Sequence, residues 1–96
     1  MSEKDYKPWI IRQIQSLSPG VKIRIFGSRA SGTHKKYSDL DLALIGPSKM
    51  EPKVLGQLHA IFAVSDIPYK IDLVDYTAVD DEFKKIIDET SLPWEI

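Results

Sequence analysis

Two aspartates lie inside an apolar, alternating run, "SDLDLALI", and this run limits what the chain can fold into. Leucine occupies every second position from Leu40 to Leu44, which is typical of a strand with one buried face. Asp39 and Asp41 then share the opposite face, with Cα atoms about 6.6 Å apart by strand rise. Aspartate is unfavourable in strands, and like charges this close repel each other unless a cation lies between them. The run therefore predicts a sheet with one apolar face and one face suited to a bound cation.

The remaining periodicity predicts helices and strands in alternation. The expected elements are a helix over residues 9–17, a strand over 21–26, a helical turn over 28–31, a strand over 38–45, a helix over 54–62, a strand over 69–76 and a final helix. Thr77 and Asp80 are spaced as in a capping box, which predicts that the final helix begins at Thr77. The tail, "SLPWEI", has no usable period. This order favours an α/β (α+β) fold in which helices pack mainly on one face of a small mixed sheet.

Length, composition and charge favour one small cytoplasmic domain over residues 1–96. The 13 basic and 14 acidic side chains nearly cancel, so no overall charge attracts nucleic acid or a membrane surface. The absence of cysteine excludes disulfides, thiolate metal sites and a cysteine nucleophile. No apolar stretch is long enough to span a membrane, and the first nine residues lack the apolar core of a signal peptide.

A third aspartate, Asp72, lies in the middle of the predicted strand "KIDLV". If that strand lies beside residues 38–45 with its apolar face inward, Asp72 joins Asp39 and Asp41. Each aspartate alone has an ordinary alternative, such as a turn, a cap or a solvated strand position. The three on one predicted face favour a Mg²⁺ site, because this hard cation prefers carboxylates together with substrate phosphates. Asp75 falls on the other face and is expected to be a cap or a solvated strand end.

The stretch "GSRASG" at residues 27–32 follows a strand and is small and turn-forming. Gly27 allows the backbone to approach an anion closely, and Ser28 offers a hydroxyl and an N–H group to phosphate oxygens. Arg29 has two open interpretations, a contact to nucleotide phosphates or a bridge to an acidic neighbour. The stretch lacks the ending of a P-loop and the third glycine of a dinucleotide-binding turn.

Gly27-Ser28, Asp39-Leu40-Asp41 and the distant Asp72 together resemble the signature of the nucleotidyltransferase superfamily related to DNA polymerase β. The small size, "GSRASG" and "SDLDLAL" are most similar to the minimal nucleotidyltransferases of prokaryotes, and the resemblance covers about residues 21–75. One departure is Ser31, where many minimal members carry a second basic residue.

The resemblance implies transfer of a nucleoside monophosphate from a nucleoside triphosphate, here ATP, to a hydroxyl group with the help of two Mg²⁺ ions. By the same resemblance, Asp39 and Asp41 would bind the metal ions that hold the triphosphate. Asp72 would help to bind one ion and favour deprotonation of the attacking hydroxyl. Gly27 and Ser28 would cradle the phosphates, and Arg29 would complete the nucleotide-binding set.

Minimal members commonly pair with a separate helical HEPN protein, and many such pairs resemble toxin–antitoxin modules in which the transferase adenylylates its partner. The resemblance therefore implies a HEPN partner, with homo- or hetero-oligomers both open; Trp9, Trp94 and the apolar tail are candidate contacts. Two other functions stay open at this point. One is a binding module that inhibits a HEPN partner by occlusion, and the other is a sensor that binds Mg²⁺–ATP without transfer.

Overall fold

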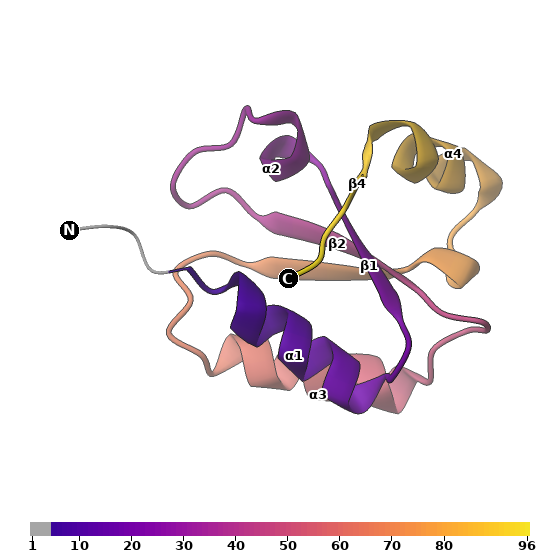
Figure 1. Cartoon of the computed structure of the whole chain (residues 1–96), viewed down its shortest axis with the longest axis horizontal. Coiled ribbons are helices and arrows are strands. Elements are labelled where there is room, and N and C mark those ends of the chain that lie inside the picture. The colour runs from indigo at the N-terminus through magenta and orange to yellow at the C-terminus, as the bar shows by residue number, and fades with distance from the viewer. Residues whose placement is uncertain (1–4) are drawn as a thin grey trace.

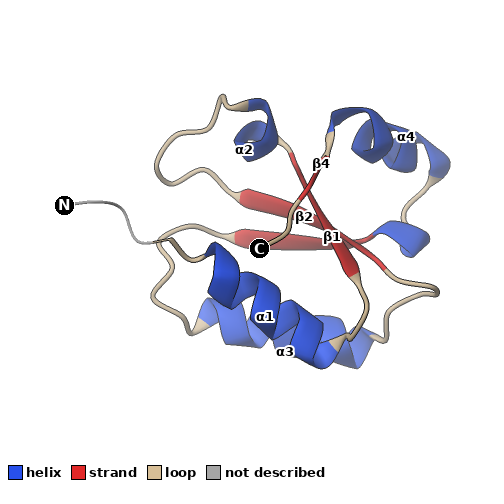
Figure 2. Ribbon diagram, in the orientation of Figure 1, coloured by secondary structure: helices blue, strands red, loops and turns tan. Residues whose placement is uncertain are grey.

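The computed structural model describes residues 5–96, which form a four-stranded sheet with its helices packed on both faces (Figures 1 and 2). The elements are α1 (Lys7–Leu17), β1 (Lys22–Phe26), α2 (Ser28–Ser31), β2 (Leu40–Ile45), α3 (Pro52–Ala63), β3 (Ile71–Asp75), the 3₁₀ helix η1 (Tyr76–Ala78), α4 (Asp81–Thr90) and β4 (Leu92–Pro93). The expectation about a signal peptide falls partly on residues 1–4, which lie outside the described residues.

The sheet is mixed, as the sequence predicts, and its strands lie in the order β3-β2-β1-β4. β1 runs antiparallel to both β2 and β4, whereas β2 and β3 run parallel. A parallel pair needs a long crossover, which the 12-residue helix α3 provides between β2 and β3. This parallel pair carries Asp41 on one strand and Asp72 on the other.

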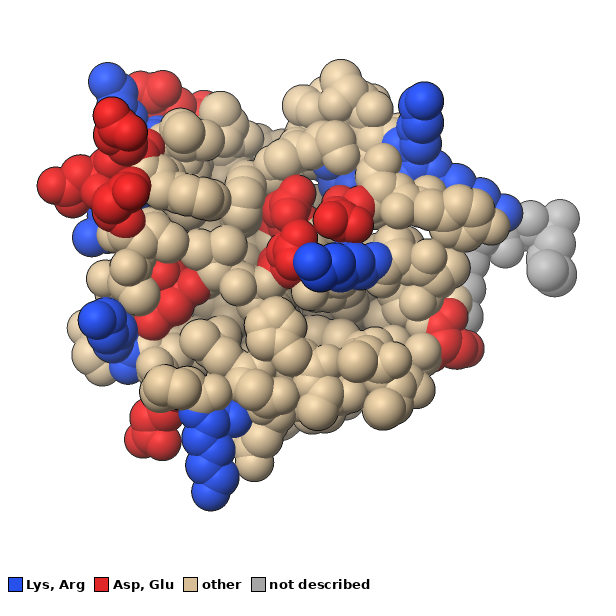
Figure 3. Space-filling view, turned by 180° about the vertical axis from the view of Figure 1, so that it is seen from behind, with Lys and Arg blue, Asp and Glu red and all other residues tan. Residues whose placement is uncertain are grey.

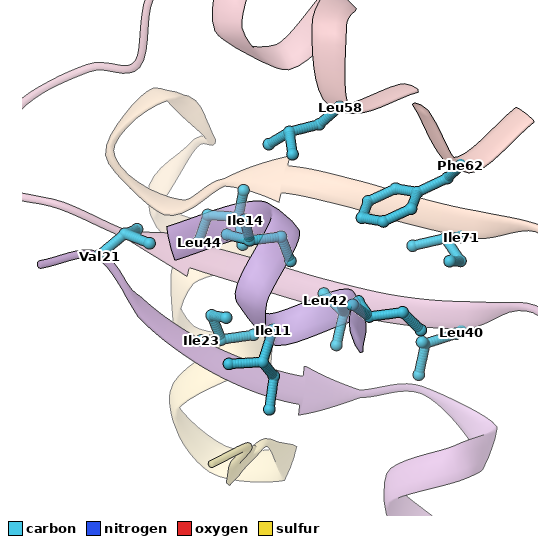
Figure 4. Close-up of a cluster of buried hydrophobic side chains, with 11 residues drawn as sticks. Ile11, Ile14, Val21, Ile23, Leu40, Leu42, Leu44, Leu58, Phe62 and Ile71 are labelled. Atoms are coloured by element: carbon cyan, nitrogen blue, oxygen red, sulfur yellow. The ribbon is translucent and has the colours of Figure 1, made fainter. Parts of the chain in front are cut away.

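The leucine face of β2 is covered by α1 and α3, which confirms the expected apolar side of the sheet (Figure 4). The buried cluster on this side draws on both helices and on all three longer strands. Its members are Ile10, Ile11, Ile14, Val21, Ile23, Leu40, Leu42, Leu44, Leu58, Phe62 and Ile71. Burial of these side chains fixes which face of β2 points inward, and so leaves Asp41 on the opposite face.

α4 covers part of that opposite face. Its Ile87 is fully buried, and Phe83 packs edge-to-face against Phe26 of β1 with ring centroids 5.8 Å apart. Arg24 of β1 fastens the end of α4 by donating to Ser91 Oγ at 2.7 Å and to the Ser91 carbonyl at 2.9 Å. The rest of this face carries the aspartates.

One local prediction for the C-terminal part needs correction. The last helix does not begin at Thr77: Asp80 is its N-cap and accepts a hydrogen bond from Phe83 N at 2.8 Å. The tail, for which the sequence shows no usable period, contains β4, which pairs with β1, and Trp94 N donates to Ile23 O at 2.9 Å. A strand of two residues is too short for alternation to reveal. Within residues 5–96, no helix combines the length and apolarity that a membrane span needs.

Candidate active site

The register between β2 and β3 brings Asp41 and Asp72 together. Asp41 is the parallel partner of Asp72, and neighbouring residues in such a register point to the same face of the sheet. Leu40 N donates to Lys70 O at 2.8 Å, which holds this register at the start of both strands. The sequence predicts the face of each aspartate, and the structure adds that the two lie directly side by side.

Asp39 and the glycine turn complete this group of residues. Asp39 precedes β2 by one residue, is exposed, and its charge acts on Asp41. Gly27 has a φ of +73° and lies so close to Asp41 that a Cβ on Gly27 would overlap Asp41 Oδ2. Only glycine therefore fits where the turn after β1 meets the carboxylate of β2. Gly27, Asp39, Asp41 and Asp72 thus form one site, which we call the carboxylate site.

The charges of the carboxylate site disfavour the ionised form of Asp41. Burial raises the pKa of Asp41 above its ordinary value, the charges of Asp72 and Asp39 raise it further, and the charge of Lys70 lowers it. Lys70 Nζ lies 3.2 Å from Asp72 Oδ1. Figure 3 shows acidic side chains gathered near the middle of one face, with a basic side chain against them. A bound cation would relieve this repulsion.

The donor set fits Mg²⁺ only when a substrate supplies further ligands. Among residues 5–96, no three histidine or acidic side chains converge as a complete cation site, and Asp72 pairs with Lys70 instead. Mg²⁺ usually binds through one or two carboxylates together with substrate phosphates and water. The carboxylate site offers hard oxygen ligands and an unfavourable excess of negative charge, as such a shared site requires.

Ser28 and Arg29, the other predicted nucleotide-binding residues, are placed differently. Ser28 opens α2 beside Gly27, and its hydroxyl has no hydrogen-bond partner within the described chain. Arg29 instead donates to two backbone carbonyls, from Nε to Ser38 O at 3.0 Å and from Nη2 to Lys36 O at 3.1 Å. Among residues 5–96, no acidic side chain forms an ion pair with Arg29, and its Nε and Nη2 donate to backbone carbonyls instead.

Two residues near the site add to what the sequence predicts. Asp75 is a cap, as one of its two interpretations had it, but it is buried rather than solvated. Its carboxylate accepts hydrogen bonds from Met50 N, Thr77 N and Thr77 Oγ1 at 2.8, 3.0 and 2.9 Å. Lys70 was missed, although its position two residues before Asp72 on the same strand predicts a shared face.

A separate cavity of about 490 Å³ lies between α1, β1 and the C-terminal segment. Its lining is largely apolar, with Ile11, Ile23 and Trp94 among its residues, and Glu95 is the one acidic side chain among the described residues that line it. This cavity lacks the paired acidic groups that metal-dependent phosphate chemistry needs. The carboxylate site is the better candidate for catalysis.

Comparison with curated proteins finds a close sequence relative. The chain is 39% identical over 74 residues to the probable protein adenylyltransferase MntA of Haemophilus influenzae. The matched segment is 77% of this chain and 65% of that relative, so the chain spans about two thirds of the relative's length.

Solved structures share the fold. One is a crystal structure of a toxin–antitoxin with AMP-PNP, which matches 93% of this chain and 72% of that chain at a TM-score of 0.79 and 22% identity. Another contains a tri-AMPylated HEPN toxin of Shewanella oneidensis in complex with an MNT antitoxin, and matches 93% of this chain and 68% of that chain at a TM-score of 0.72 and 19% identity.

The family comparison covers nearly all of the described residues. The match extends over residues 7–94, from the first turn of α1 to the residue after β4, and includes the glycine turn and all three aspartates. With this match and the 39% identical relative, the chain belongs to the nucleotidyltransferase domain family.

Proposed function

We propose that this chain is a Mg²⁺-dependent protein adenylyltransferase that moves AMP from ATP to a hydroxyl group of a HEPN partner, as the antitoxin of a toxin–antitoxin pair. The observation that carries the proposal is the meeting of Asp41 and Asp72 with the glycine turn at Gly27. The names of the similar proteins support the nucleotide, the partner and the acceptor class. The proposed location is the cytoplasm, where ATP is available.

In the proposed reaction, the acceptor hydroxyl oxygen attacks the α-phosphorus of ATP. A new O–P bond forms, the bond from the α-phosphorus to the bridging oxygen breaks, and pyrophosphate leaves. Asp72 takes the hydroxyl proton. Gly27 admits the phosphates close to the backbone, and Ser28 donates its hydroxyl to a phosphate oxygen. Orientation of the reactants is the main contribution of the protein.

Asp39 and Asp41, with Asp72 as a shared ligand, would hold two Mg²⁺ ions. When bound, the ions would neutralise the triphosphate and stabilise charge on the entering and leaving oxygens. The raised pKa of Asp41 supports this assignment, because burial and the charges of Asp72 and Asp39 disfavour its ionised form, which a bound cation would stabilise. Ser31 offers a hydroxyl rather than a second positive charge, so phosphate binding would depend on the metal ions more than on basic side chains.

The direct test is transfer of label. The protein would be mixed with Mg²⁺, α-labelled ATP and a candidate HEPN protein, and label on the HEPN protein would be measured. The matched pair is Asp39→Ala/Asp41→Ala and Glu82→Ala/Glu89→Ala, which removes the same charge from exposed positions of α4. We expect label with the wild type and the α4 variant, and none with the Asp39/Asp41 variant.

The result also distinguishes the competing functions. Tight complex formation without label, by the wild type and the Asp39/Asp41 variant alike, would overturn the proposal in favour of inhibition by occlusion. Binding of Mg²⁺–ATP by the wild type without any label or complex would favour the nucleotide sensor.

A further inference from the structure

Arg29 makes three contacts that link separate segments around the carboxylate site. Its guanidinium donates to the carbonyls of Ser38 and Lys36, and the guanidinium carbon lies 4.1 Å from the centroid of the Tyr69 ring. Arg29 itself belongs to α2, two residues after Gly27. One side chain thus joins the glycine turn, the α2–β2 loop (residues 32–39) and the residue two before β3.

The α2–β2 loop is itself folded tightly where Arg29 holds it. Ser38 N donates to Lys35 O at 3.1 Å, and Lys35 N donates to Ser38 Oγ at 2.9 Å. These two bonds close a turn whose final carbonyl is the one that receives Arg29 Nε. Asp39 is the next residue. Its backbone therefore begins at a point fixed by the guanidinium of Arg29.

The contact with Tyr69 connects the Arg29 side chain to the segment that leads into β3, the strand that carries Asp72. Tyr69 directly precedes Lys70, whose carbonyl accepts Leu40 N at 2.8 Å. Arg29 therefore contacts the chain just before Asp39 and just before the segment that leads to Asp72. The Arg29 side chain thus contacts both backbone segments that lead into the carboxylate site, the one before Asp39 and the one before Asp72.

These contacts use properties that arginine has and lysine lacks. The guanidinium is flat, presents several N–H donors in a fixed fork and stacks on aromatic rings, whereas an ammonium group is a compact point charge. The same fork also matches phosphate oxygens, so the distinction rests on the observed contacts: Nε and Nη2 already donate to carbonyls, and the guanidinium lies over the Tyr69 ring. The geometry of Arg29 is that of a group holding two carbonyls and one ring.

We propose that Arg29 is a positioning residue: it holds the α2–β2 loop against β3 and thereby fixes Asp39 beside Asp41. The inference rests on the proposed function, because its consequence is the affinity of the carboxylate site for metal ions. Groups that orient metal ligands typically change metal affinity by about 10- to 100-fold when they are replaced.

The test compares Arg29→Lys and Arg29→Met with Arg12→Lys and Arg12→Met, in which the exposed Arg12 of α1 is the matched control. Three quantities would be measured: amide hydrogen exchange in the α2–β2 loop, Mn²⁺ affinity in the presence of a saturating non-hydrolysable ATP analogue, and kcat and KM for ATP. We expect both Arg29 variants to exchange faster in the loop and to bind Mn²⁺ about tenfold more weakly. Added metal should restore part of their activity, and the Arg12 variants should match the wild type.

A phosphate contact would give a different pattern, in which KM for ATP rises while Mn²⁺ affinity and hydrogen exchange in the α2–β2 loop are unchanged. That pattern, or unchanged loop exchange, would overturn the inference. If the Arg29 variants fail to fold, Tyr69→Leu removes the stacked ring and should weaken Mn²⁺ binding, with Tyr69→Phe as the control. Wild-type protein that binds no Mn²⁺ and transfers no AMP would overturn the proposed function, whereas loop exchange would still decide whether Arg29 holds the loop.

Discussion

Asp41 and Asp72 lie side by side on one face of the sheet, because β2 and β3 run parallel with these two residues as register partners. Burial raises the pKa of Asp41 above its ordinary value, and the charges of Asp72 and Asp39 raise it further. A pairing that costs stability in the folded chain is typical of a functional site rather than of a structural one. Substitutions at this pair and around it can separate a catalytic role from a structural one.

Replacing Gly27 by alanine should abolish transfer and destabilise the fold. With φ +73° and ψ −159°, Gly27 lies in a region essentially restricted to glycine, which costs another residue about 1–3 kcal/mol, and the new Cβ would overlap Asp41 Oδ2 in addition. Gly20 is the matched control, because its φ is +81° and a Cβ there would meet no heavy atom within 4 Å. We expect Gly20→Ala to lose only the strain energy and to keep its activity, as measured by urea denaturation and label transfer. Equal behaviour of the two variants would contradict the close contact at Asp41.

Asp41→Asn should stabilise the metal-free protein at neutral pH while it abolishes transfer. Because the folded state raises this pKa, the favourable contribution of the protonated form is fully present below the ordinary value of 3.8. That contribution is lost as the pH rises through the raised folded value. The stability difference between variant and wild type should therefore be near zero at pH 3 and favour the variant at pH 7, as measured by urea denaturation. A difference independent of pH would show that charge repulsion is not its cause.

Lys70→Gln should tighten the binding of Mn²⁺ in the presence of a saturating non-hydrolysable ATP analogue. Lys70 Nζ forms an ion pair with Asp72 Oδ1 at 3.2 Å, and the ammonium charge repels an incoming cation. Because the pair is well exposed, we expect only about a two- to fivefold gain at low salt, which should fade at high salt. Lys53→Gln on the exposed side of α3 is the control. Weaker Mn²⁺ binding by the Lys70 variant would contradict this competition.

Asp72→Ala and Asp75→Ala should have opposite effects, although the two residues share β3. Asp75 accepts three hydrogen bonds in a buried position, so its loss should cost about 1–3 kcal/mol of stability. The folded fraction of Asp75→Ala should still transfer label. Asp72→Ala should keep its stability and lose transfer. Thermal melts and label transfer on the same samples would decide, and a stable but inactive Asp75 variant would contradict the assignment.

The local parts of the fold could be predicted, because alternation and helical spacing are local signals. Leu40 and Leu44 gave the buried face of β2 correctly, and Gly32 marked the end of α2 with its left-handed conformation. The register of β2 with β3 could not be predicted, since strand parity gives a face and not a partner. β4 was missed because its two residues are placed by pairing with β1 and by the bond from Trp94 to Ile23.

The candidate site, like the fold, could be predicted only in part from the sequence. The sequence predicts Asp39, Asp41 and Asp72 on one face; the structure pairs Asp41 with Asp72, sets Gly27 against Asp41 and leaves Asp39 exposed just before β2. Their roles in metal and nucleotide binding stay predictions. The partners of Arg29 could not be foreseen, because it binds backbone carbonyls, and any residue in the α2–β2 loop offers a carbonyl.

Asp39 and Asp41 lie on either side of the boundary where β2 begins. Asp41 belongs to a strand paired on both sides, whereas Asp39 ends a surface loop. Loops open at lower free-energy cost than paired central strands. On heating, the loop that carries Asp39 should therefore unfold locally while Asp41 remains in its paired strand. Activity should then be lost reversibly several degrees below the temperature at which the sheet unfolds.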